Sequence, residues 1–382
     1  MPGADRYLRG PSTTVVHLIT TLGQGGAERV LSQVVPRPDE RAGEHHVVVS
    51  LVDGGMFADE LIAEGVEVRG LGMRPGRDLV RGTLRFARLL RDHRPTMVIS
   101  WLYHANLLDL LARPFAGEAR RARMVWMLRS SLQSPIGVPL HTRATIRLLA
   151  RLSTVPEAIV VNSRAGRAEH ERRGFRPQAW KLLSNGCDTT VFRPRPDTRE
   201  WMRARLGIRP EAVAAIMVAR THPQKNHETL ISALRLAHLR HPEIELLLVG
   251  SGTEALDSDH PGSLRIHGLG QRQDVPDLLS ACDLLVSSSL TEGLPNSLLE
   301  GMASGLVPIV TDVGDCSEVI GEIGLSVPPG EAEALADALV NVLERPESER
   351  AALGTLARER VIKLADHATS RVNYASLWRD LR

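Results

Sequence analysis

The sequence predicts an α/β protein with two parallel β-sheets, each covered by helices on both faces. Short apolar runs of strand length alternate with helical patterns along nearly the whole chain of 382 residues. Such alternation is typical of doubly wound parallel sheets. The strand-like runs form two sets, and the Pro-punctuated stretch 185–197 between them indicates a link. A chain of this length can bury two hydrophobic cores.

The elements can be placed in chain order. The first set of strand-like runs is 15–20, 47–51, 66–70, 97–101, 123–128, 158–161 and 181–184. The second set begins near 214 and continues at 246–250, 264–267, 284–288 and 307–311. We therefore predict a flexible N-terminus at 1–13, a first domain at 14–190, a second domain at 191–365 and a helical segment at 366–382.

Composition constrains the class of protein. The 47 Lys and Arg nearly balance the 45 Asp and Glu, and we expect no nucleic-acid partner. The first 190 residues carry 27 basic and 18 acidic side chains, which favours an anionic acceptor or a membrane surface as a partner of this half. Three scattered cysteines indicate reduced thiols in a cytoplasmic protein. No apolar run approaches the roughly 18 residues that span a bilayer, so we expect a soluble or peripheral protein.

Two carboxylates flank the start of one predicted helix. Gly293 and Pro295 exclude a helix through Glu292, so we expect Glu292 in a loop. Asn296 or Ser297 can cap a helix that carries Glu300 in its first turn. The free N–H groups at that helix start attract an anion, and carboxylates accept hydrogen bonds from hydroxyls. A nucleoside diphosphate sugar fits this arrangement; the alternative is a capped surface helix with two solvated glutamates.

Two cations follow the apolar run 213–219. Arg220 and Lys225 emerge at its C-terminal end, the edge at which doubly wound sheets bind ligands. A guanidinium and an ammonium five residues apart can neutralise a diphosphate leaving group. Taken alone, the pair would more often belong to a solvated loop.

With these motifs the chain resembles the retaining GT-B glycosyltransferases, especially the large group-4 family that builds bacterial surface glycans. The Glu-x7-Glu spacing from Glu292 to Glu300 carries the resemblance. Four further segments agree with it in order and spacing, namely 217–227, 245–252, 264–270 and 14–29. The resemblance covers nearly the whole chain beyond the first dozen residues. It implies two Rossmann-like domains that face each other across a cleft, and a C-terminal helix that crosses back to the first domain.

The resemblance also implies roles for individual residues. Arg220 and Lys225 would hold the diphosphate, Glu292 the transferred sugar and Glu300 the ribose hydroxyls. His104, which follows a strand of the first domain, would touch the donor sugar or phosphate, although a structural histidine is the alternative reading. The remaining donor-binding candidates are Gly25, Gly26, Gly250, Gly252, His267, Gly268, Leu294, Pro295, Asn296, Ser297 and Leu298.

The implied reaction moves a sugar from a nucleotide diphosphate sugar to an acceptor hydroxyl, in polysaccharide or lipid-linked oligosaccharide biosynthesis. It needs no metal or other cofactor, because Arg220 and Lys225 supply the positive charge. Asp257 and Asp259 form an Asp-x-Asp sequence, but this lies in a polar loop away from any strand end. Two alternatives remain open: a sugar-nucleotide epimerase of GT-B architecture, and a catalytically silent GT-B partner subunit.

A basic stretch of the first half predicts contact with a membrane. Cations beside an apolar, Pro-punctuated loop at 131–140 suit a bilayer surface or a diphosphate lipid. We therefore expect peripheral attachment at the inner face of the cell membrane and a glycan or lipid-linked acceptor; the alternative is a solvated, Arg-rich surface. The residues are Arg113, Arg120, Arg121, Arg123, Arg129, Arg143, Arg147 and Arg151, with Trp126, Leu132, Ile136, Val138 and Leu140.

Overall fold

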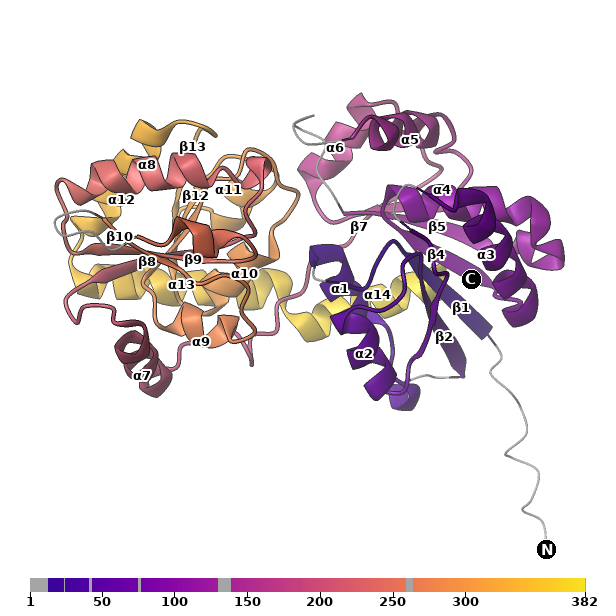
Figure 1. Ribbon diagram of the computed structural model, residues 1–382, viewed down its shortest axis with the longest axis horizontal. Coiled ribbons are helices and arrows are strands. Elements are labelled where there is room, and N and C mark those ends of the chain that lie inside the picture. Colours follow the sequence, from indigo (N-terminus) through magenta and orange to yellow (C-terminus); the bar gives the residue numbers. More distant parts are fainter. Residues whose placement is uncertain are drawn as a thin grey trace, which may run out of the picture.

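The computed structural model describes residues 13–23, 25–40, 43–74, 77–129, 139–258 and 264–381. The chain forms two lobes, each built on one parallel sheet with helices on both faces (Figure 1). This confirms the fold class that the alternating pattern predicts.

The first sheet has seven parallel strands in the order β3-β2-β1-β4-β5-β6-β7. They are β1 Thr13–Ile19, β2 Glu44–Ser50, β3 Glu67–Gly70, β4 Met97–Trp101, β5 Arg123–Leu128, β6 Ala158–Val161 and β7 Trp180–Leu182. The α-helices of this lobe are α1 Gly26–Val34, α2 Met56–Ala63, α3 Leu79–His93, α4 Tyr103–Ala112, α5 Leu140–Arg151 and α6 Arg164–Arg172. The strand order reverses between β1 and β4, so this lobe has its switch point there.

The second sheet has six parallel strands in the order β10-β9-β8-β11-β12-β13, with its switch point between β8 and β11. They are β8 Val213–Val218, β9 Ile244–Val249, β10 Arg265–Gly268, β11 Leu284–Ser287, β12 Val307–Thr311 and β13 Leu325–Val327. The α-helices are α7 Pro196–Leu206, α8 His227–His238, α9 Val275–Ser280, α10 Asn296–Ala303, α11 Cys316–Ile320, α12 Ala332–Leu343 and α13 Glu347–Ala365. Strand β13 was not predicted, because its three residues form only a short, partly exposed edge.

Each central strand packs on both of its faces. Val16 and Leu18 of β1 join the hydrophobic cluster on one side of the first sheet, whereas Val15 and Ile19 join the cluster on the other. Both faces are therefore apolar, which explains why these strands read as near-continuous apolar runs.

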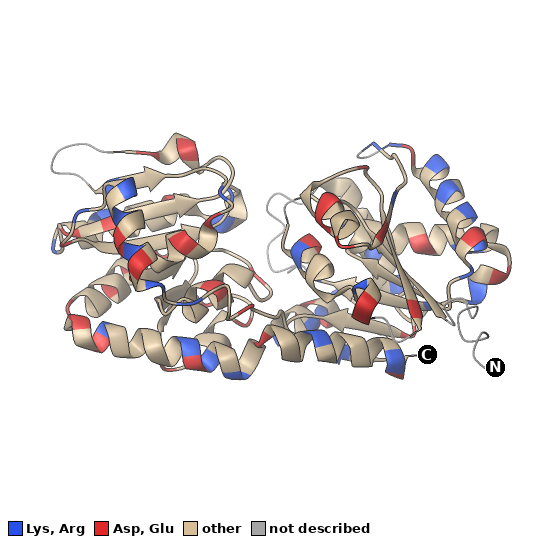
Figure 2. Ribbon diagram, turned by 90° about the horizontal axis from the view of Figure 1, so that it is seen from below, with Lys and Arg blue, Asp and Glu red and all other residues tan. Residues whose placement is uncertain are grey.

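The last helix, α14 (His367–Asp380), belongs to the core of the first lobe although it ends the chain. Its Tyr374, Leu377 and Trp378 pack in the same cluster as Ile19 and Trp101. Helices α13 and α14 lie end to end across the two lobes, which is clearest from below (Figure 2).

Part of the predicted basic surface turns inward, and the prediction was wrong there. Trp126 is fully buried. Arg113 pairs with the buried Asp109, and Arg129 donates hydrogen bonds to Tyr374 and Asn185. The sequence spacing of arginines cannot show which of them meet an internal acceptor.

Other members of that surface lie near the outside. Arg121 and Arg123 pair with Glu118 and Glu157, so their charges are partly compensated. Leu140 of α5 is 79% exposed. Loop residues 131–138 of the predicted membrane contact lie outside the described residues. Within the described part of the chain, no helix combines the length and apolarity needed to cross a membrane.

Candidate active site

The predicted cations and carboxylates gather at the switch point of the second sheet. Arg220 and Lys225 follow β8, Glu292 follows β11, and Glu300 lies on α10. Strands β8 and β11 are neighbours in the sheet, and the chain leaves them in opposite directions. Their loops therefore open a crevice at the carboxyl edge, where open α/β sheets bind ligands.

Lys225 and Glu292 form an ion pair in this crevice. Ser289 Oγ donates a 2.7 Å hydrogen bond to Glu292 Oε1, and the Glu292 side chain is only 13% exposed. A small cavity between β8, β11 and α10 is lined by these three side chains and Ser297. A carboxylate that accepts hydrogen bonds and an ammonium group that attracts an anion thus line the same small cavity.

The start of α10 differs from the prediction. Pro295 is the residue before the helix, no side chain caps it, and Glu300 lies beyond the first turn. The predicted cap by Asn296 or Ser297 was wrong. The Asn296 side chain is engaged elsewhere, because its Oδ1 accepts a 2.5 Å hydrogen bond from Asn185 Nδ2.

Asn185 connects the loop that leads into α10 to the first lobe. Its Nδ2 also donates a 2.9 Å hydrogen bond to the carbonyl of Leu294, and its Oδ1 accepts one from Arg129. Leu294 and Leu298 are 7% and 1% exposed and pack in the core of the second lobe. Leu294 is therefore open to a ligand through its backbone groups, whereas Leu298 also lines the small cavity beside Lys225 and Glu292.

Two glycines allow the loop after β9 to lie against the loop after β8. Gly250 has φ +144°, and a Cβ there would stand 2.4 Å from the carbonyl oxygen of Ala219. Gly252 has φ +89°, and a Cβ there would stand 1.9 Å from Thr221 Oγ1. Any larger residue would push the backbone beside Arg220 out of place.

The two candidates on β10 are held inside the sheet region. His267 Nε2 lies 2.8 Å from Glu245 Oε2, and the Gly268 N–H donates a 2.8 Å hydrogen bond to Asp257 Oδ1. Burial disfavours ionisation of Glu245, but hydrogen bonds from His267 and Arg209 outweigh it and lower its pKa to about 2. The His267 side chain therefore supports the strand pair β9–β10.

No cluster of metal-ligating side chains is found among the residues that the structure describes. Of the predicted Asp-x-Asp, Asp257 bonds to Gly268, and Asp259 lies outside the described residues.

The first lobe meets this crevice with the start of α1. Gly25 precedes the helix, and a Cβ on Gly26 would lie 3.7 Å from Asn296 Nδ2 of the second lobe. Arg29, one turn further on, forms an ion pair with Glu300 across the lobes. Burial raises the pKa of Glu300, and Arg29 opposes that rise. The glycine turn therefore lies against the start of α10.

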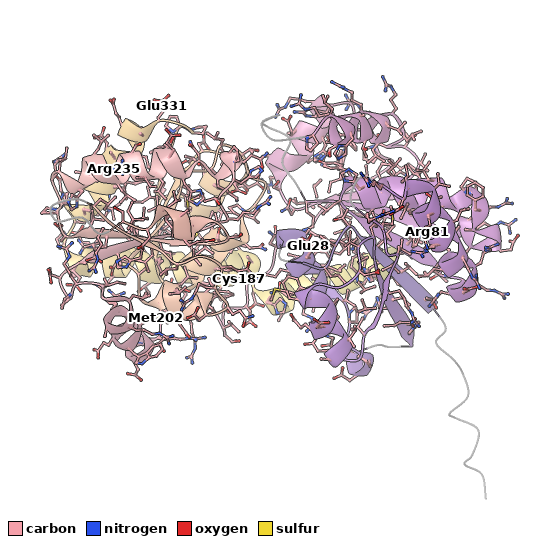
Figure 3. All side chains as sticks on the ribbon, in the orientation of Figure 1. Glu28, Arg81, Cys187, Met202, Arg235 and Glu331 are labelled. Atoms are coloured by element: carbon pink, nitrogen blue, oxygen red, sulfur yellow. The ribbon has the colours of Figure 1, made fainter. Side chains whose placement is uncertain are left out.

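Glu28 and Arg29 were missed as site residues, although they follow the predicted glycine turn directly. Glu28 is 7% exposed, and Figure 3 places it on the side of the first lobe that faces the second. Burial raises its pKa, while a hydrogen bond from its own backbone N–H and the charge of Arg220 act in the opposite direction. The signal in the sequence was an acidic and a basic residue near the start of a helix that follows a glycine turn.

His104 is the second residue of α4, which follows β4 at the switch point of the first sheet. Its ring centroid lies 5.7 Å from that of His141 on α5. Burial and then the charge of His141 lower the pKa of His104, so its ring is neutral at pH 7. Within the described part of the chain, Arg29 and not His104 reaches Glu300.

Comparison with known proteins agrees for both halves of the chain. Residues 24–191 match the family described as Glycosyltransferase Family 4, and residues 212–345 match Glycosyl transferases group 1. EpsD of Bacillus subtilis is 29% identical over 207 residues, which cover 52% of this chain and 54% of EpsD. The UDP-Gal:alpha-D-GlcNAc-diphosphoundecaprenol alpha-1,3-galactosyltransferase of Escherichia coli is 29% identical over 178 residues, 44% of this chain and 46% of that enzyme. The chain thus spans about half the length of these two curated relatives.

A solved structure has the same fold over nearly the full length. The crystal structure of Anabaena HepE in complex with UDP and glucose superimposes with a TM-score of 0.81 at 21% identity. The alignment covers 96% of this chain and 100% of HepE.

Proposed function

The chain belongs to the group-4 glycosyltransferases, and we propose that it transfers a sugar from a nucleotide diphosphate sugar to an acceptor hydroxyl with retained anomeric configuration. The observation that carries this proposal is the contact between Lys225 and Glu292 at the switch point of the second sheet, where Arg220 also follows β8. Support also comes from HepE, a protein of the same fold whose structure holds UDP and glucose.

The donor lies across the second lobe in this proposal. Arg220 and Lys225 stabilise the diphosphate, and they do so most strongly when negative charge builds up on the departing phosphate. Glu292 binds the hydroxyls of the transferred sugar, and Glu300 binds those of the ribose. The backbone around Leu294–Ser297, together with the glycines after β9 and at the end of β10, contacts the rest of the nucleotide. His104 and the Gly25–Gly26 turn close the site from the first lobe.

The reaction proceeds on one face of the sugar. The bond between the anomeric carbon and the donor phosphate oxygen breaks, and the acceptor oxygen bonds to the carbon on the same face. The acceptor's hydroxyl proton passes to the departing phosphate oxygen. Glu292 is held by Lys225 and Ser289, so we assign it to sugar binding and not to nucleophilic attack. In this scheme the two cations balance the leaving group's charge without a metal or other cofactor.

We assign the acceptor to polysaccharide or lipid-linked oligosaccharide biosynthesis. The Escherichia coli relative is named for a diphosphoundecaprenol-linked sugar acceptor. The outer face of α3 offers a membrane contact better than the stretch 113–129: Leu79, Val80 and Leu84 are 46%, 75% and 50% exposed. Arg81 and Arg88 are exposed beside them, and cations next to apolar side chains favour an anionic bilayer surface.

Release of nucleoside diphosphate tests the proposed reaction. The protein is incubated with a panel of nucleotide sugars, with and without acceptor lipid, and sugar products are analysed. We expect acceptor-dependent release with at least one donor, and its loss in Lys225→Ala. Conversion of the nucleotide sugar without release would indicate an epimerase. Neither release nor conversion, with Lys225→Ala indistinguishable from the parent, would indicate a silent subunit.

Co-sedimentation with vesicles tests the membrane contact. We expect binding to anionic vesicles at low salt that falls steeply as salt rises, since the Debye length is about 8 Å at physiological ionic strength. Arg81→Glu and Arg88→Glu should weaken it, whereas Arg240→Glu on the other lobe should not. Equal recovery with neutral vesicles would point to a soluble acceptor.

A further inference from the structure

Two neighbouring residues of α1 stand against the groups that we assign to the nucleotide. Arg29 of the first lobe donates to Glu300, the carboxylate assigned to the ribose hydroxyls. The Glu300 side chain is 8% exposed and that of Arg29 is 38% exposed. The guanidinium thus occupies an acceptor position of the Glu300 carboxylate that a ribose hydroxyl would use.

The carboxylate of Glu28 lies over the start of the same helix. A Cβ on Gly25 would stand 2.1 Å from Glu28 Oε2, so this oxygen covers the turn that leads into α1. The free N–H groups of a helix start attract an anion. Here the helix supplies that anion itself. Arg220, the cation assigned to the diphosphate, lies near enough to lower the pKa of Glu28.

We propose that the Glu28–Arg29 pair occupies the nucleotide's place in the ligand-free protein and that a donor must displace it. Arg29 gives Glu300 the N–H donors that ribose would replace with O–H donors. Glu28 gives the α1 start and Arg220 a negative charge that the diphosphate would replace. Arg29 is thus a gating residue of the donor site. This inference rests on the proposed function, since it takes Glu300 and Arg220 as nucleotide ligands.

Displacement has a measurable cost in affinity. When only a fraction of the molecules has the site open, the apparent dissociation constant rises by the inverse of that fraction. Breaking the Arg29–Glu300 pair should therefore tighten the binding of a free nucleotide. A merely structural role for Arg29 predicts the opposite, because loss of a structural contact loosens the site.

Calorimetric titration with UDP, GDP and ADP tests the proposal. We expect Arg29→Met, which keeps the side-chain length and removes the charge, to bind the best of these nucleotides about tenfold tighter than the parent. Arg29→Lys should stay near the parent value. The ratio of parent to Arg29→Met dissociation constants should approach one as salt screens the pair. Arg240→Met, which breaks the exposed pair with Glu344 on the second lobe, is the matched control and should leave the affinity unchanged.

The outcomes separate this inference from the proposed function. If parent and Arg29→Met bind a nucleotide equally well, or the variant binds it more weakly, the gate is refuted and the nucleotide site stands. If neither protein binds any of the three nucleotides, both proposals fail. Glu28→Gln provides an independent variant should Arg29→Met not fold: about threefold tighter binding supports the gate, and unchanged or weaker binding refutes it.

Discussion

The switch points of the two sheets have the same topology but different contents. In the second lobe, the loops after β8 and β11 bring a cation, Lys225, and a carboxylate, Glu292, into direct contact. In the first lobe, β1 leads to a glycine turn followed by Glu28 and Arg29 of α1, and β4 leads to His104, whose pKa burial lowers. Equivalent sheet edges therefore hold different chemistry, and the segments that follow the strands decide it.

The largest expected effect concerns the core of the first lobe, which helix α14 completes. Trp378 of α14 is 1% exposed and packs into the first lobe from the end of the chain. Trp378→Ala should cost about 4 kcal/mol of unfolding free energy, the usual loss for a large buried aromatic. Urea unfolding measures it, with Trp201→Ala as the control because Trp201 is 54% exposed. Equal midpoints for the two variants would show that the packing of Trp378 adds nothing to the stability of the first lobe.

The next effect tests whether the second lobe holds the chemistry. Lys225→Ala and Arg220→Ala should each lower the turnover rate by about 100-fold or more, because each removes a contact that strengthens as the leaving group departs. His104→Ala in the first lobe should lower it less, by about tenfold. Steady-state turnover rates of variants whose folding is intact measure these losses. A larger loss in His104→Ala than in Lys225→Ala would reverse the comparison between the lobes.

The sequence predicted the second lobe's site better than the first, and the reason is physical. Lys225 and Glu292 lie in loops that follow strands that read as apolar runs, so topology brings them together. Contacts between lobes have no such local signal: Arg29 and Glu300 are 271 positions apart.

The differences between the predicted and the observed fold have the same cause, because contacts between distant parts of the chain leave no local signal in the sequence. Strands β4, β5, β6 and β12 coincide with the predicted runs because both of their faces are buried. Trp126 and Arg129 were placed on a surface, since nothing near them in the sequence shows the cluster with α5 in which Trp126 packs, or the Tyr374 and Asn185 side chains that Arg129 reaches. The family resemblance indicated a glycosyltransferase, which residue spacing alone could not do. Both matched family descriptions confirm this family.

A tenfold effect should separate the two glutamates of the second lobe. Glu300→Ala should weaken the binding of a free nucleoside diphosphate about tenfold, because a pair of charge-assisted hydrogen bonds to ribose is lost. Glu292→Ala should leave that affinity unchanged and should raise the KM for the nucleotide sugar. Calorimetry with UDP, GDP and ADP measures the first effect. Parent-like nucleotide binding by Glu300→Ala would remove the ribose assignment.

The smallest effect compares carboxylates by their pH dependence. Glu245 has a folded pKa of about 2, below its ordinary value, so it stabilises the second lobe above pH 5 and loses this contribution as pH falls towards 2. Glu245→Gln should therefore cost about 2 kcal/mol at pH 7 and progressively less in acid. Glu300 has the opposite shift, because burial raises its pKa. Glu300→Gln should gain stability relative to the parent as pH rises, and urea unfolding from pH 3 to 8 would reveal both trends.

A crystal structure with bound nucleoside diphosphate tests the donor site most directly. The account predicts electron density for the diphosphate beside Arg220 and Lys225, with the ribose hydroxyls on Glu300. Density for the nucleotide at the β1–β4 edge of the first lobe, or phosphates that contact neither cation, would contradict it.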